Sequence, residues 1–103
     1  MIYYLRVFDN KTGRLVGQLV DITTQGMKLT SQHPVETNAS FELRMVLPDT
    51  INGERKITFD TESIWCTKDI NPKYYSIGFE FRQISQRDIK KVENLIMEFS
   101  FEN

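Results

Sequence analysis

The sequence predicts a mainly β fold, a six-stranded antiparallel barrel with one C-terminal α-helix packed across it. Apolar and polar residues alternate with a period of two in several short segments separated by turn-forming residues, which is typical of half-buried strands. After Ser85 the apolar spacing changes to that of a helix. Because 103 residues have room for one hydrophobic core, we expect a single domain over residues 1–103.

The predicted strands follow one another with short links. In the first, over residues 1–9, apolar residues such as Leu5 and Val7 alternate with residues such as Arg6. The turn formers of residues 9–13 then indicate a hairpin. The other strands are expected over residues 14–21, 26–31, 41–47, 57–66 and 75–81. So many short-linked strands favour a barrel, which also leaves no open sheet edge.

Three details of the fourth and fifth strands can be predicted. Residues 48–53 are rich in turn formers and are expected to form a polar loop. Ile57 and Ile64 lie in opposite phases of the period-two pattern, so we expect a β-bulge near residues 60–63. Trp65 is expected in the core, which is the usual place for a tryptophan of a barrel strand.

The helix has a recognisable start. Ser85 is a good N-cap with Asp88 three residues later, and Ile84 can pack on Ile89 as a hydrophobic staple. The apolar stripe that should dock the helix on the barrel consists of Ile89, Val92, Leu95, Ile96 and Phe99.

The bend between the second and third strands is the strongest candidate site. Asp21 and Thr23 have short oxygen side chains that can bond nearby backbone N–H groups. Gly26 can take a positive φ or let another backbone or a ligand come close. The bend is either a self-satisfied turn that shapes the barrel rim or a means of presenting polar atoms to a ligand.

The motif Asp21-x-Thr23-x-x-Gly26 resembles the D/N-x-S-x-x-G motif of the PilZ domain family, best known as bacterial receptors for cyclic di-GMP. Residues 62–66 resemble the family's valine-tryptophan strand, residues 76–81 resemble its I-G-x-x-F strand, and a terminal helix follows. The resemblance covers nearly the whole chain. It implies a barrel and a role in cyclic di-GMP-linked control of motility, attachment or polysaccharide export.

The chain departs from the family at the arginine motif R-x-x-x-R, whose place, counted back from Asp21, falls before Met1. Arg6 and Arg14 do not have the required spacing. We therefore expect weak or no nucleotide binding and action through a protein partner. The alternative is a genuine cyclic di-GMP receptor that combines Arg6, Arg14 or another subunit's arginine with the turn. The resemblance implies that Asp21 and Thr23 would then bond guanine and that the ligand would approach Gly26.

Two further surfaces are candidates for partner binding. A cluster of four cations lies around the helix start and either docks an acidic partner or phosphate or forms a solvated face: Arg82, Arg87, Lys90 and Lys91. Phe99 and Phe101, near the chain end, either complete the core or form an apolar patch for a partner or a second copy of the chain.

Composition excludes other classes. The net charge of −1 gives no global attraction for DNA or RNA, and no apolar run is long enough to span a membrane. One cysteine and one histidine, Cys66 and His33, make a metal site improbable. We find no catalytic constellation, and we expect a cytoplasmic, non-enzymatic domain without a resident cofactor.

Overall fold

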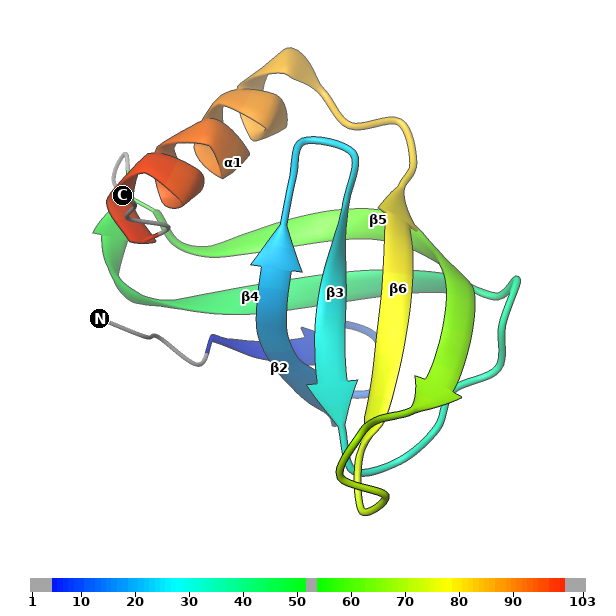
Figure 1. Ribbon diagram of the computed structural model, residues 1–103. Helices are drawn as coiled ribbons and strands as arrows, with labels where there is room; N and C mark the ends of the chain where they lie inside the picture. The colour runs from blue at the N-terminus through cyan, green and yellow to red at the C-terminus, as the bar shows by residue number, and fades with distance from the viewer. Residues whose placement is uncertain (1–4, 52–53, 100–103) are drawn as a thin grey trace.

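The computed structural model describes residues 5–51 and 54–99, in which six strands form a closed antiparallel barrel and one helix lies across an end of it (Figure 1). The strands are β1 Arg6–Asp9, β2 Leu15–Ile22, β3 Gly26–Ser31, β4 Ser40–Ile51, β5 Glu54–Lys68 and β6 Tyr75–Phe81, and the helix is α1 Gln86–Phe99. Around the barrel the order is β1-β2-β3-β6-β5-β4, and β1 closes the sheet on β4. The predicted fold class is confirmed.

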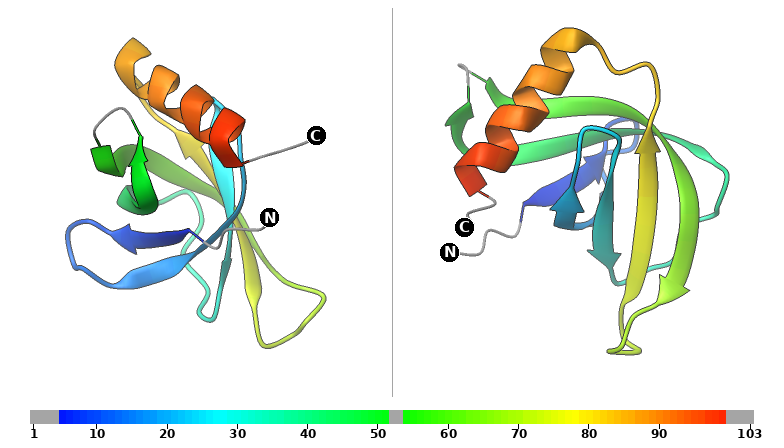
Figure 2. Two further views of the ribbon diagram at one scale, coloured as in Figure 1. Left: turned by 90° about the vertical axis from the view of Figure 1, so that its left-hand side faces the viewer. Right: turned by 45° about the horizontal axis from the view of Figure 1, so that its top comes forward.

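One hydrophobic core fills the barrel and continues under the helix. It receives side chains from β1, β3, β4, β5 and β6, because every second residue of a strand faces the interior. From α1, Val92 and Leu95 are almost completely buried, while Ile96 and the preceding Ile84 pack at the margin. The helix lies at the same end of the barrel as the β2–β3 turn (Figure 2).

Two local signals, the N-cap of α1 and the turn of the first hairpin, behave as predicted. Ser85 Oγ accepts a hydrogen bond from the Asp88 backbone N–H at 3.1 Å, so Ser85 caps α1. In the β1–β2 hairpin the Asp9 N–H donates to the Arg14 carbonyl at 2.8 Å, and Gly13 takes a φ of 78°. Glycine suits this position because it adopts the left-handed region without a steric cost.

The prediction of a polar loop is wrong for residues 48–51, which belong to β4, and residues 52–53 lie outside the described residues. Strand β4 continues to Ile51 and β5 begins at Glu54, and these two residues pair across the hairpin. The register between β4 and β5 shifts between Val46 and Ile51. Such an irregularity can accommodate Pro48 within a strand, because its missing N–H need not serve the regular ladder.

The prediction of Trp65 as a core residue is also wrong. The bulge in β5 lies between Ser63 and Trp65, slightly beyond the predicted residues 60–63. Ser63 is buried, whereas Trp65 is 39% exposed on the outer face. The extra residue of the bulge, Ile64, reverses which face the following side chains occupy.

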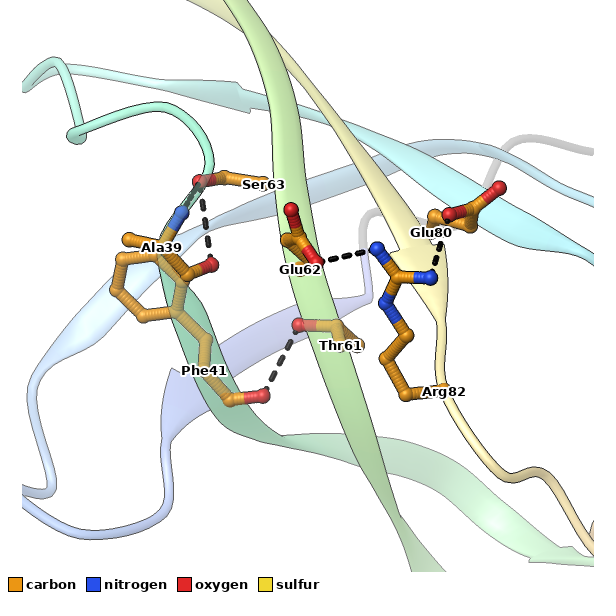
Figure 3. A network of polar contacts seen from close by, with 7 residues as sticks. All are labelled: Ala39, Phe41, Thr61, Glu62, Ser63, Glu80 and Arg82. Carbon is orange, nitrogen blue, oxygen red and sulfur yellow. Dashed lines mark hydrogen bonds and ion pairs between the residues drawn. The ribbon is translucent and has the colours of Figure 1, made fainter.

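Two buried hydroxyl groups of β5 donate hydrogen bonds to backbone carbonyls. Ser63 Oγ donates to the Glu36 carbonyl at 2.6 Å and accepts from the Ala39 N–H at 3.1 Å. Thr61 Oγ1 donates to the Phe41 carbonyl at 3.0 Å (Figure 3). These bonds hold the connection before β4 against β5 and remove the cost of burying polar groups.

Candidate functional site

The β2–β3 turn is internally bonded but still presents polar atoms. The Thr23 N–H donates to the Gly26 carbonyl at 2.9 Å, and Thr23 Oγ1 accepts from the Gln25 N–H at 3.1 Å. Asp21 Oδ1 accepts from the Ile22 N–H at 2.9 Å. Both side chains are exposed. The second carboxylate oxygen of Asp21 and the hydroxyl proton of Thr23 therefore face solvent and could bond a ligand or a partner.

Close packing against β6 requires a glycine at position 26. Gly26 pairs with Glu80 of β6, and a Cβ atom at Gly26 would overlap the carbonyl oxygen of Phe79. The Phe81 N–H donates to the Gln25 carbonyl at 2.9 Å, which joins the turn to the end of β6. The backbone of β6 therefore occupies the space that the missing side chain of Gly26 leaves open. Gly26 itself does not adopt a positive φ.

Four residues form a row on the outer face of the barrel. Asp21 of β2 pairs with Lys28 of β3, Lys28 pairs with Gly78 of β6, and Gly78 pairs with Trp65 of β5. A Cβ atom at Gly78 would overlap Nε1 and Cε2 of Trp65, so the indole lies directly against the β6 backbone. The turn and the exposed tryptophan consequently belong to one continuous surface.

Carboxylates surround the guanidinium group that lies near the turn. Arg82, just after β6, forms ion pairs with Glu62 of β5 and, at 3.1 Å, with Glu80 of β6 (Figure 3). Glu80 pairs with both Glu62 and Gly26 in the sheet, which places the network beside the turn. Sequence reasoning grouped Arg82 with the helix-start cations, because only the barrel order brings β5, β6 and the turn together.

Arg6 and Arg14 occupy very different positions. Arg6 is exposed and pairs with Gln18, so it lies roughly 10 Å along β2 from Asp21 and one strand away. Arg14 precedes the opposite end of β2, about 23 Å from Asp21 at the usual rise per strand residue. Of these two residues, Arg6 lies nearer to the turn.

The predicted partner-binding residues at the helix are only partly described. Lys91 Nζ lies 3.7 Å from Asp88 Oδ1, and Arg87 and Lys90 are exposed on the first turns of α1. Arg87 also has a bonding partner. The side chain of Phe99 and all of Phe101 lie outside the described residues.

Other chemistry finds little support in the described part of the chain. Residues 5–51 and 54–99 contain no cluster of three or more histidine, cysteine, aspartate or glutamate side chains that could hold a metal ion. Cys66 packs at the core margin, and His33 is exposed, with its backbone bonded to the Ser31 hydroxyl. In the same ranges no helix is both long and apolar enough to cross a bilayer.

The model of one protein family, described as the PilZ domain, matches residues 4–98. No curated protein matches the chain in sequence. Among solved structures, the barrel is similar to Escherichia coli YcgR in complex with c-di-GMP, with 14% identity and a TM-score of 0.71, over 92% of this chain and 40% of that one. It is similar to the Bacillus subtilis inhibitor of motility, MotI/DgrA, with 14% identity and a TM-score of 0.74, over 95% and 47% of the two chains.

A third similar structure is the PilZ domain of Escherichia coli YcgR with c-di-GMP, with 13% identity and a TM-score of 0.72, over 94% of this chain and 81% of that one. The chain spans less than half the length of the longer YcgR and MotI chains. At these identities the structural likeness concerns the fold, and the family assignment rests on the match over residues 4–98.

Proposed function

Because this chain belongs to the PilZ domain family, we propose that it is a non-enzymatic adaptor in bacterial cyclic di-GMP-linked signalling. It works in the cytoplasm through contact with a protein partner and binds the nucleotide weakly or not at all. Its similarity to a protein named as an inhibitor of motility fits a role in controlling motility, attachment or polysaccharide export.

The charge around the turn is the observation that carries this proposal. Three carboxylates, those of Asp21, Glu62 and Glu80, share the surface with two cations, Lys28 and Arg82. Arg82 is already held between two of the carboxylates. Such a surface disfavours a ligand that carries two phosphate charges.

The supply of guanidinium groups points the same way. Guanidinium groups suit cyclic di-GMP because they pair with phosphate and stack on guanine. Two such hydrogen bonds would contribute roughly 3–6 kcal/mol, a factor of about a hundred to ten thousand in affinity. Of Arg6, Arg14 and Arg82, Arg14 is at the far end of β2 and Arg82 is engaged by two carboxylates, which leaves Arg6.

Isothermal titration calorimetry of the full chain with cyclic di-GMP tests the proposal. We expect no measurable heat, or a dissociation constant weaker than ~10 µM at physiological salt. Binding tighter than this would overturn the proposal in favour of the receptor hypothesis.

The second candidate is a true cyclic di-GMP receptor, and the solvent-facing oxygen of Asp21 and hydroxyl of Thr23 favour it. The similar YcgR structures contain c-di-GMP. In a receptor, Asp21→Ala and Arg6→Ala would each weaken binding at least about tenfold, and binding would weaken with added salt. Arg14→Ala is the matched control, because it removes the same charge about 23 Å from Asp21 and should leave affinity unchanged. Unchanged affinity in Asp21→Ala would exclude the turn as the site.

A further inference from the structure

Trp65 lies on the outside of the barrel, against the backbone of β6. Its ring occupies the space that a side chain at position 78 would take, so the β6 backbone supports one side of the indole. The residue is 39% exposed. Within residues 5–51 and 54–99 its Nε1–H donates no hydrogen bond, although a tryptophan N–H usually has a partner when it is buried. A supported aromatic ring loses little conformational freedom on binding, which suits it to anchor a partner.

Apolar side chains extend the surface around Trp65. Ile64, the bulge residue beside it, is 42% exposed. Val20, which precedes Asp21 on β2, is 54% exposed. The row from Asp21 through Lys28 and Gly78 connects these positions across the sheet. The surface thus has an aromatic anchor with apolar and charged neighbours, as the energetically important parts of protein interfaces do.

Charges of both signs lie beside the ring: Lys28 of β3 pairs with Gly78, which the indole covers, and Glu80 of β6 offers a carboxylate. Glu80 is two residues from Gly78 on β6, so both face outward, about 7 Å apart. The Glu80 side chain is 52% exposed and gives one oxygen to Arg82. An aromatic face with a carboxylate beside it is suited to a planar cation. A guanidinium group can stack on the ring and at the same time donate hydrogen bonds to the carboxylate.

The chain itself contains such a pair elsewhere. The Arg44 guanidinium carbon lies 5.2 Å from the centre of the Phe8 ring. In the described residues no cation of the chain lies over Trp65 in this way. Trp65 therefore offers the same kind of aromatic face to a cation from another molecule.

We propose that the outer face at Trp65, with Glu80 beside it, docks an arginine-bearing segment of the protein partner. The arginine guanidinium stacks on the exposed indole face and donates to the Glu80 carboxylate, while Ile64 gives apolar contact beside it. Val20, three strands away on β2, contacts another part of the segment. This inference rests on the proposed adaptor function and names the chemistry of the partner. The carboxylates beside the turn would then favour the cationic partner, whereas they would repel an anionic nucleotide.

Trp65 is the chain's single tryptophan, so its emission, excited at a wavelength that the four tyrosines do not absorb, reports on this surface. The probes are three short blocked peptides in which glycine alternates with arginine, lysine or glutamate. We expect a saturable change in Trp65 emission with the arginine peptide, a weaker one with the lysine peptide, and none with the glutamate peptide. No response to the arginine peptide, or an equal response to all three, would overturn the inference.

Matched variants localise the effect. Glu80→Gln should weaken binding of the arginine peptide at least about threefold, because it removes the counter-ion beside the ring. Glu93→Gln makes the same charge change at an exposed position of α1 and should leave the affinity within about twofold. Equal losses in both variants would indicate general attraction between opposite charges and would overturn the inference.

A last titration separates this inference from the function on which it rests. Cyclic di-GMP added to the full chain should leave Trp65 emission unchanged at micromolar concentrations. A saturable change with a dissociation constant tighter than ~10 µM would overturn the adaptor function itself. Failure of the arginine peptide without a nucleotide response would overturn only the docking chemistry.

Discussion

At the scale of single residues, a substitution of Gly26 tests whether the glycine of the turn motif is needed for the fold or for binding a ligand. Because a Cβ atom there would overlap the Phe79 carbonyl oxygen, Gly26→Ala must push β3 away from β6. We expect a loss of about 2–3 kcal/mol in the free energy of unfolding, measured by urea denaturation without ligand. Gln25→Ala, in the same turn but with an exposed side chain, should change it by less than about 0.5 kcal/mol. A Gly26→Ala protein as stable as the original would mean that the close approach is not constrained.

Trp65 illustrates why some single residues could not be placed from the sequence. The period-two pattern was sufficient for Leu43 and Met45, which are fully buried as alternation predicts. Whether the Trp65 side chain faces the core or the solvent depends on the position of the bulge in β5. Moving the bulge by one residue would place the side chain on the opposite face of the sheet. No residue type in the segment fixes that position. The space for the indole comes from Gly78, on a different strand.

At the scale of elements, the helix provides the clearest energetic test, because its two faces differ sharply. Leu95 is 1% exposed in the common core, whereas Met97 is 82% exposed. Leu95→Ala should lower the free energy of unfolding by about 2–5 kcal/mol, since it removes buried methyl groups and leaves a cavity. Met97→Ala should change it by no more than about 0.5 kcal/mol. Equal effects in urea denaturation would contradict the docking of α1 through Val92 and Leu95.

Most element boundaries followed from local chemistry. Ser85 fixed the start of α1, and the polar residues after Asp21 fixed the end of β2, because both signals act on the backbone immediately beside them. The end of β4 could not be predicted, since Pro48 and its neighbours form turns in most contexts. Pairing with β5, from Ile51 to Glu54, keeps this segment in the sheet, and such pairing is a tertiary effect.

At the scale of the whole molecule, the number of strands predicted a barrel, but their order around it was not predictable. Neighbours in sequence pair in β1–β2 and β2–β3, whereas β3 pairs with β6 and β1 with β4. These distant pairings create the candidate surface, because they set Asp21 and Trp65 in one row and Arg82 beside Glu62. The residues of the turn could be read from the sequence, while their neighbours could not.

The shared core predicts that the barrel and the helix unfold together. Val92 and Leu95 belong to the same buried cluster as the strand residues, and closure of β1 on β4 leaves no edge from which a strand could separate. Fluorescence of Trp65 reports on β5, and far-ultraviolet circular dichroism reports largely on α1. We expect both signals to change with one midpoint in urea, as in a two-state transition.

Leu95→Ala should then lower both midpoints in parallel, although Trp65 is not in the helix. A dichroism midpoint below the fluorescence midpoint would mean that α1 detaches first and that the core is divided.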